Sequence, residues 1–196
     1  MSEEIKLKPK IVLRRKQAPA AFTFNGLLKV KCSWKEGAVS SDLDLCLFYK
    51  RKDGQTGGVF SKLFRQKKSD EGSLDQFPYM LHKGDVKATP DAPYAEEQIN
   101  VANLDEIETA YICVLAYDAA VEGEEVSFEG CDGKVELMSD AGDYLETPLD
   151  EAAKGHLCLI CTIENNDGEN SVRNISEIMD LATAVDKIPG FKLLIQ

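Results

Sequence analysis

The chain has 196 residues, of which 43% are hydrophobic, and its formal net charge is −11. This length can bury a sizeable core, and no apolar run approaches the roughly 18 residues that a membrane-spanning helix needs. The first four residues, Met-Ser-Glu-Glu, are acidic, and no apolar targeting segment follows them. We therefore expect a soluble, cytoplasmic protein with no transmembrane segment.

Charge is divided unevenly along the chain. Residues 1–70 contain 16 Lys and Arg and 7 Asp and Glu, a net charge of +9, whereas residues 71–196 contain 7 and 27, a net charge of −20. An anionic partner for the basic part, or a head-to-tail contact between two copies, would fit this asymmetry. We favour a third explanation, in which basic and acidic strands pair within one fold.

The N-terminal residues 1–20 carry three apolar residues between basic ones and reach a break at Pro19. This pattern predicts a basic N-terminal arm or an edge strand. We expect residues 21–196 to form a single domain. Its first clear element is residues 26–34, where apolar residues alternate with Lys29, Lys31 and Ser33, which predicts a half-buried strand.

The segment 41–49 is the most informative strand of the sequence. If it is extended, Leu43 and the apolar residues at every second position share one face, while Asp42 and Asp44 open the other face. Two carboxylates that point the same way, two residues apart, can share one hard cation. This end of the strand is therefore a candidate metal site.

Residues 50–75 are rich in charge and glycine, with a turn signal at Asp53-Gly54. Basic residues interleaved with Phe60 and Phe64 could bind single-stranded nucleic acid. The alternative is a mobile loop that two rings hold against the sheet. We favour the loop, because the rest of the chain is strongly acidic, and we do not expect nucleic acid as a partner.

A proline-punctuated acidic loop follows at residues 88–97, after His82-Lys83-Gly84-Asp85. Acidic side chains spaced along an irregular loop suit Ca²⁺, which collects 6–8 oxygen ligands in loose geometry. Such a loop can equally be a solvated surface segment.

Further strands are expected at 99–101, 110–118, 126–128, 133–138, 144–148 and 156–163, and the apolar run 110–118 predicts a central strand covered on both faces.

Five of the six cysteines lie in apolar, strand-like runs, and only Cys131 lies in a turn. We expect reduced core residues rather than a disulfide framework. Cys158 and Cys161 have the spacing of a metal-binding pair, but residues three apart on a strand face opposite ways and cannot bind one metal.

In the C-terminal segment the spacing of apolar residues changes from that of strands to that of a helix. Asn174 with Glu177 three residues later predicts a helix cap, and the apolar residues between Ile175 and Ile188 recur at helical spacing. Pro189-Gly190 ends the helix, and residues 191–195 could add a last strand. We expect the apolar stripe to pack the helix on the sheet.

The order of these motifs resembles the TerD family of tellurium-resistance and stress-response proteins. The resemblance covers about residues 24–163: Trp34, the Asp42-Leu43-Asp44-Leu45 segment, His82 to Asp85, acids that end at Glu96-Glu97, and a long apolar strand that closes in Asp118. It implies a mostly β fold, a β-sandwich of two sheets with short helices, to which this chain adds a C-terminal helix. The family binds calcium through acids in these loops, so the resemblance implies one Ca²⁺ site near the rim formed by Asp42, Asp44, Asp85, Asp91, Glu96, Glu97 and Asp118.

The sequence departs from the family pattern at several positions. Cys46 stands where the family tends to have a further Asp, which removes one hard oxygen ligand, and Val86 stands where it has Asn. The basic insertion 50–75 and the capped helix before Phe191 also differ. These departures leave weakened or lost calcium binding as the alternative.

No motif for a catalytic nucleophile or a phosphate loop is present in the sequence, and His82 and His156 are its only imidazoles. His82 could act as a base oriented by Asp85, but at turn spacing we favour a surface contact. We expect a non-enzymatic stress-response protein that binds Ca²⁺ at an acidic rim. The alternative is a metal-free interaction module whose basic loop 50–68 binds another protein, an anionic membrane surface or nucleic acid.

Overall fold

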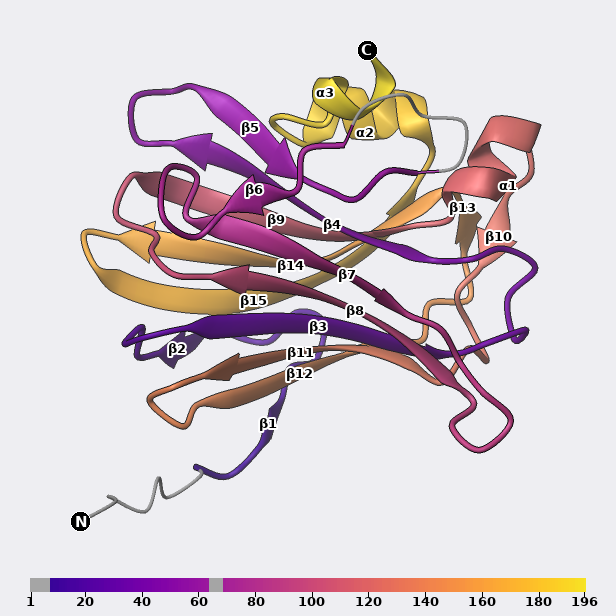
Figure 1. Cartoon of the computed structure of the whole chain (residues 1–196), viewed down its shortest axis with the longest axis horizontal. Coiled ribbons are helices and arrows are strands. Elements are labelled where there is room, and N and C mark those ends of the chain that lie inside the picture. The colour runs from indigo at the N-terminus through magenta and orange to yellow at the C-terminus, as the bar shows by residue number, and fades with distance from the viewer. Residues whose placement is uncertain (1–7, 64–68) are drawn as a thin grey trace.

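The computed structural model describes residues 8–63 and 69–196, and within them two large sheets pack face to face (Figure 1). The seven-stranded sheet has the order β1 (Ile11–Val12), β12 (Tyr144–Leu149), β11 (Gly133–Ser139), β3 (Leu28–Lys35), β8 (Tyr94–Val101), β7 (Met80–Val86), β6 (Gly72–Ser73). The six-stranded sheet has the order β2 (Ala20–Phe22), β15 (Glu169–Met179), β14 (Leu157–Asn166), β9 (Ile107–Leu115), β4 (Asp44–Arg51), β5 (Thr56–Val59). The predicted β-sandwich is confirmed.

Smaller elements lie around the sheets. The helix α1 (Tyr117–Glu122) follows β9, and β10 (Val126–Ser127) pairs with β13 (Lys154–Gly155). Two short helices, α2 (Leu181–Lys187) and α3 (Lys192–Ile195), end the chain. None of the described helices is long and apolar enough to cross a membrane.

The main core lies between the sheets and follows the alternation of the strands. In β4, Leu45, Leu47 and Tyr49 belong to this core, whereas Cys46 and Phe48 face the other side, as the sequence predicted. The central strand β9 is covered on both faces, which is also confirmed. It ends at Leu115, however, and the residues up to Asp118 turn into α1 instead of continuing the strand.

A second apolar cluster covers the outer face of the six-stranded sheet. Phe191, fully buried, packs against Phe48 with ring centroids 5.1 Å apart, and Ile188 and Leu194 belong to the same cluster. The two C-terminal helices thus bury the apolar side of β4 and β9 that faces away from the main core.

The C-terminal prediction is wrong in two respects. Residues 169–179 form strand β15 instead of the start of a helix, and residues 192–195 form helix α3 instead of a strand. The helix cap is Asp180, whose Oδ1 accepts a hydrogen bond from the Thr183 N–H at 2.7 Å. The Asn174 side chain instead donates to the Leu13 carbonyl at 2.8 Å.

The prediction of a loop over residues 50–75 is also wrong in part. This segment contains β5 and β6, and Phe60 and Asp70 form a bridge between them. Phe60 is buried with its ring 6.2 Å from that of Phe48, so one of the two predicted ring anchors is confirmed. Phe64 lies outside the described residues.

The two cysteines at metal-pair spacing do not face opposite ways. A bulge in β14 between Leu159 and Cys161 shifts the register, and as a result Cys158 and Cys161 both point into the main core. The prediction that Cys158 and Cys161 face opposite sides of the strand is therefore wrong. All six cysteines are free and buried, so their prediction as core residues is confirmed.

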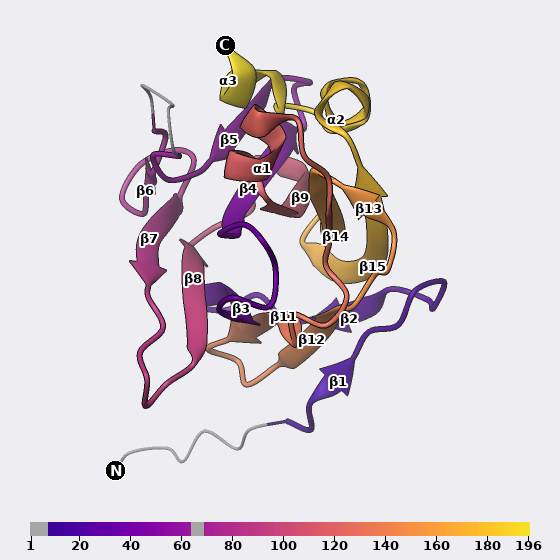
Figure 2. The same ribbon diagram turned by 90° about the vertical axis from the view of Figure 1, so that its right-hand side faces the viewer.

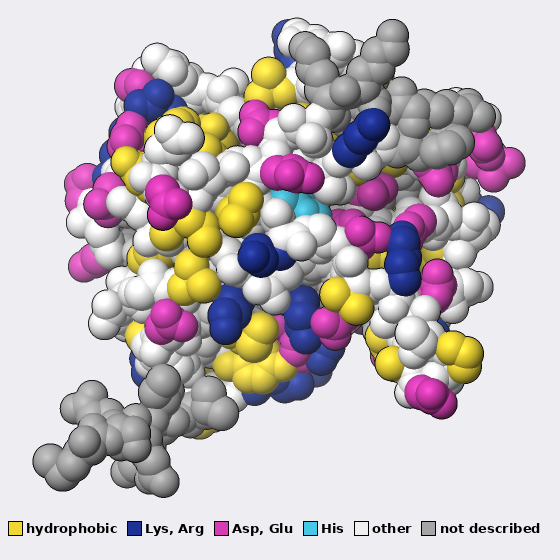
Figure 3. Space-filling view, in the orientation of Figure 1, with side chains coloured by type: hydrophobic (Ala, Val, Ile, Leu, Met, Phe, Trp, Pro, Cys, Tyr) yellow, Lys and Arg dark blue, Asp and Glu magenta, His cyan; other side chains and the backbone are white. Residues whose placement is uncertain are grey.

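The uneven charge of the sequence is resolved inside the fold. Basic residues of the first part pair with acids of the second part, among them Lys8–Asp143, Lys10–Glu146, Arg15–Glu151, Lys31–Glu136, Lys50–Glu108 and Arg51–Glu106. Figure 3 shows basic and acidic side chains interspersed on one face of the molecule. This agrees with the explanation that we favoured from the sequence.

The N-terminal arm, residues 8–22, lies along the side of the sandwich opposite β5 and β6 (Figure 2). Its strand β1 pairs in parallel with β12, and β2 pairs antiparallel with β15 of the other sheet. The arm therefore contributes an edge strand to each sheet. On the opposite side, the Phe60–Asp70 bridge connects the ends of β5 and β6.

Candidate functional site

The acidic residues singled out in the sequence meet at a cavity of about 140 Å³ at one end of the sandwich. It is lined by Asp42, Asp44, Ser61, Lys62, Asp85, Lys87, Glu97 and Asp118. These residues come from the start of β4 and the segment before it, the segment after β5, the end of β7 and the residue that follows it, β8, and α1. Five of the seven predicted metal ligands are therefore together.

The other two predicted ligands lie elsewhere. Asp91 is exposed in the turn between β7 and β8 and does not line the cavity. Glu96 points to the outer face of the seven-stranded sheet, where its Oε1 lies 3.4 Å from the Lys31 Nζ. Because residues 94–101 are a strand, Glu96 and Glu97 point to opposite faces of it.

Glu97 connects the two sheets beneath the cavity. It is buried, and its Oε2 accepts a hydrogen bond from the Leu45 N–H at 2.5 Å, so that β8 of one sheet is joined to β4 of the other. A carboxylate between sheets is costly unless it is paired, and this bond together with the nearby His82 supplies the pairing.

His82 lies under the cavity rather than on the surface, so the predicted surface contact with Asp85 is wrong. Its Nδ1 accepts a hydrogen bond from the Gly84 N–H at 3.0 Å, which leaves the hydrogen of the neutral ring on Nε2. Nε2 lies 3.2 Å from the Leu45 carbonyl oxygen and 3.4 Å from the Glu97 Oε2. Because its Nε2 lies against the buried Leu45 carbonyl, His82 holds β7 against β4.

Lys87 lines the cavity and pairs with two of its acids. Its Nζ lies 2.5 Å from the Asp42 Oδ2 and 2.9 Å from the Asp85 Oδ2. The hydrogen bond from Lys87 is the main cause that lowers the pKa of Asp85, and the hydrogen bonds to both acids raise the pKa of Lys87. The sequence analysis missed this lysine, although residues 85 and 87 share a face at strand spacing.

Asp44 is the acid of the cavity whose pKa is raised by burial and by the other acids. Burial raises its pKa well above the ordinary value, and the charges of Glu97, Asp42 and Asp118 raise it further, against a backbone hydrogen bond from Tyr117 that lowers it. Figure 2 shows α1, which carries Asp118, beside the start of β4. Five carboxylates and two ammonium groups line the cavity, a net charge of −3 when all are ionised.

The donor set fits a hard cation, because every acidic ligand offers carboxylate oxygens, which Ca²⁺ prefers. The arrangement, however, is not a ready-made metal site. Among residues 8–63 and 69–196, no three His, Cys, Asp or Glu side chains are already placed to hold a metal ion. A cation that enters must displace the Lys87 ammonium from Asp42 and Asp85.

Comparison with known proteins adds no family to these observations. No family model, no curated protein and no solved structure matches the chain.

Proposed function

We propose that the protein is a non-enzymatic stress-response protein of the TerD type that binds Ca²⁺ in the acidic cavity. The observation that carries the proposal is the convergence of five carboxylates on one small cavity with only two lysines. The raised pKa of Asp44 supports the proposal. Neighbouring negative charges disfavour the ionised form of Asp44, and an added cation would stabilise that form.

Binding would use Asp42, Asp44, Asp85 and Asp118, with Glu97 beneath them. Asp42 and Asp85 already hold a positive charge, the Lys87 ammonium, and would exchange it for the metal. Ca²⁺ tolerates irregular ligand sets better than Mg²⁺, which demands near-octahedral geometry. The cavity is formed by strand ends and a helix start, so we expect selectivity for Ca²⁺.

A calcium titration tests the proposal. Chelator-treated protein titrated with Ca²⁺ in a calorimeter should show one site with a Kd on the order of 10⁻⁵ to 10⁻³ M, weaker than in sensor proteins because Lys87 must leave. Asp42→Asn should reduce the affinity at least tenfold, while Asp91→Asn, which removes an exposed acid outside the cavity, should leave it unchanged. Absence of any heat up to millimolar Ca²⁺ would contradict the proposal.

Replacement of Lys87 gives a second test. Lys87→Met removes the ammonium that competes with the metal, and we expect about fivefold tighter Ca²⁺ binding, since partly exposed ion pairs contribute up to about 1 kcal/mol. Lys83→Met in β7, four residues earlier, is the matched control, because Lys83 is exposed and does not line the cavity. Equal affinities for the two variants would argue against exchange of Lys87 for the metal.

The metal-free alternative, binding through the basic loop 50–68, has less support. Lys50 and Arg51 pair with Glu108 and Glu106, and Lys62 lines the acidic cavity. These charges are largely matched within the molecule, which leaves less of the loop to attract an anionic or protein partner. Residues 64–68 lie outside the described part of the chain.

A further inference from the structure

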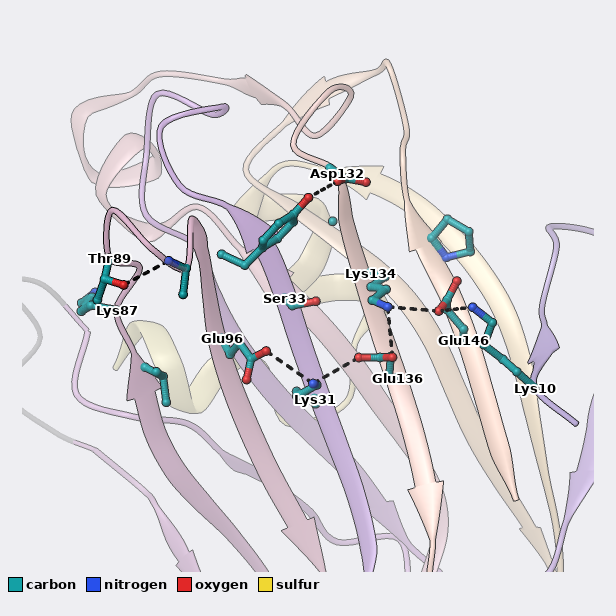
Figure 4. Close-up of a pocket in the computed structure, with 15 residues that line it drawn as sticks. Lys10, Lys31, Ser33, Lys87, Thr89, Glu96, Asp132, Lys134, Glu136 and Glu146 are labelled. Carbon is teal, nitrogen blue, oxygen red and sulfur yellow. Dashed lines mark hydrogen bonds and ion pairs between the residues drawn. The ribbon is translucent and has the colours of Figure 1, made fainter. Parts of the chain in front are cut away.

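A second and larger cavity lies on the outer face of the seven-stranded sheet, away from the core (Figure 4). Its volume is about 880 Å³, within the range of small-molecule sites in proteins. Its floor crosses β12, β11, β3 and β8, and the turn between β7 and β8 forms one wall. Neither the sequence motifs nor the proposed calcium site accounts for it.

The floor of this cavity carries a continuous row of alternating charges. The ion pairs, in order across the sheet, are Lys10–Glu146 at 3.0 Å, Glu146–Lys134 at 3.3 Å, Lys134–Glu136 at 3.1 Å, Glu136–Lys31 at 3.4 Å and Lys31–Glu96 at 3.4 Å. Figure 4 shows this row as dashed lines that run across β12, β11, β3 and β8. The charged lining also includes Lys87, which pairs with Asp42 and Asp85 outside the row, and Asp132, which accepts a hydrogen bond from the Tyr94 hydroxyl. Within the row itself three lysines match three acids.

The centre of the row is held rigidly. Glu136 is only 4% exposed although it lies on the outward face of β11, and it is held by Lys31, Lys134 and the Tyr144 hydroxyl. Burial opposes ionisation of Glu136, but these hydrogen bonds and charges lower its pKa overall. Polar groups fixed in this way lose little further conformational freedom when a ligand binds.

The remaining lining combines hydroxyl groups with apolar surface. Ser33, Thr89 and Tyr94 offer hydroxyls, and Val86 and Pro148 offer apolar contacts. Val86 is 63% exposed and Tyr94 39% exposed at the wall of the cavity. A hydrogen bond from the Tyr94 hydroxyl to Asp132 fixes the ring. Exposed apolar groups beside a polar floor are typical of a surface that a partly apolar ligand covers.

We propose that this cavity binds a neutral, polyhydroxylated ligand, namely an oligosaccharide. A charged ligand would have to break ion pairs, because each ammonium and each carboxylate of the floor already faces an opposite charge. A sugar hydroxyl can bind without breaking an ion pair. It can donate a hydrogen bond to a carboxylate lone pair that is not in use, and it can accept one from Lys31, which uses two of its three N–H donors on acids. The C–H faces of the sugar rings would pack on Tyr94, Val86 and Pro148.

Titrations followed by backbone amide NMR shifts test whether the cavity binds an oligosaccharide. Chelator is present throughout, so that the result is independent of calcium binding. The probes are neutral gluco-, galacto-, manno- and xylo-oligosaccharides of three residues, with inorganic phosphate and glycylglycine as charged probes. We expect a Kd on the order of 10⁻⁴ to 10⁻³ M for at least one sugar, with shifts concentrated in β3, β8 and β11. No such shifts with any sugar at about 10 mM, or tighter binding of either charged probe, would overturn the proposal.

Variants locate the binding. Tyr94→Ala and Glu136→Gln should each weaken sugar binding at least tenfold, whereas Glu108→Gln on the opposite sheet should not change it. Tyr94 is partly exposed and makes no part of the core, so Tyr94→Ala decides the result if Glu136→Gln does not fold. Sugar binding of wild-type strength in Tyr94→Ala would place the ligand elsewhere and overturn the proposal.

Discussion

The carboxylates of the acidic cavity differ in how they are compensated. Glu97 receives a backbone N–H, and Asp42 and Asp85 share one ammonium group. Asp44 receives a backbone hydrogen bond from Tyr117, but its pKa is still raised by burial and by three neighbouring acids. Among these acids, Asp44 is therefore the one whose ionisation the folded state opposes most strongly.

This difference predicts an unusual pH dependence of stability. As pH rises from about 4, the unfolded chain loses the Asp44 proton before the folded chain does, because the folded pKa is raised. The contribution of Asp44 to the stability of the wild-type protein is thus present at low pH and is lost as the pH rises through the pKa of Asp44 in the folded state. With chelator present, Asp44→Asn should be more stable than wild type at pH 7 and equal to it below about pH 4.

Urea unfolding over this pH range measures the difference. The Asp91→Asn variant is the control, because it removes an exposed aspartate outside the cavity. Lower stability of Asp44→Asn than of wild type at pH 7 would show that Asp44 is compensated better than its surroundings indicate.

Much of the acidic cavity could be predicted at the level of single residues. The alternation in residues 41–49 was enough to place Asp42 and Asp44 beside each other, and both line the cavity. Glu96 and Glu97 could not be separated, because the strand was expected to begin only at residue 99. The burial of His82 was missed for a related reason, since it depends on bonds to β4 that are remote in sequence.

At the scale of elements, the C-terminal segment shows where local patterns mislead. An Asn followed by Glu three residues later, with apolar residues at Ile175, Ile178 and Met179, fits a helix start. Pairing with β14 along its length, and with β2 at residues 170–172, makes this segment a strand, since tertiary contacts override such local preferences. The bulge at Cys161 is equally invisible in the sequence, because strand periodicity assumes a regular ladder.

The strand assignment gives Asn174 a different role, which can be tested. Its amide donates to the Leu13 carbonyl at 2.8 Å and accepts from the Ser176 hydroxyl at 2.6 Å. Asn174→Ala leaves both buried partners without a hydrogen bond, and we expect a loss of about 2 kcal/mol in the free energy of unfolding. It should also speed tryptic cleavage after Arg14 and Arg15, since the arm is less firmly held.

The exposed Asn166, at the end of β14, provides the control for this experiment. Asn166→Ala should change neither the urea midpoint nor the cleavage rate. If Asn174→Ala behaved like Asn166→Ala, the arm would be held by its strand pairing alone.

At the scale of the whole molecule, the individual strands followed from the periodicity and the β-sandwich from the family resemblance, whereas two of the strands at the sheet edges could not be predicted. The short strands β5 and β6 are glycine-containing and lack alternation, so only their pairing in the folded chain identifies them. The pairing of the basic and acidic parts was foreseen in general, but the individual ion pairs needed the register of β3, β8, β11 and β12.

The cysteines predict how the whole molecule responds to thiol reagents. All six are buried, and burial raises the pKa of each thiol. The folded protein should react with Ellman's reagent at least 100-fold more slowly than free cysteine, while all six thiols react at once in denaturant. Rapid reaction of even one thiol in the folded protein would contradict the burial of that residue.

The N-terminal arm pairs with the outer edge of each sheet. Strand β1 pairs with Leu145 and Glu146 of β12, and β2 pairs with residues 170–172 of β15. If the arm detaches, backbone N–H and C=O groups become free on both sheets at the same time, and such open edges pair readily with other chains. A truncated protein that begins after residue 22 should therefore aggregate even if its interior packs normally, and an affinity tag is better attached at the C-terminus.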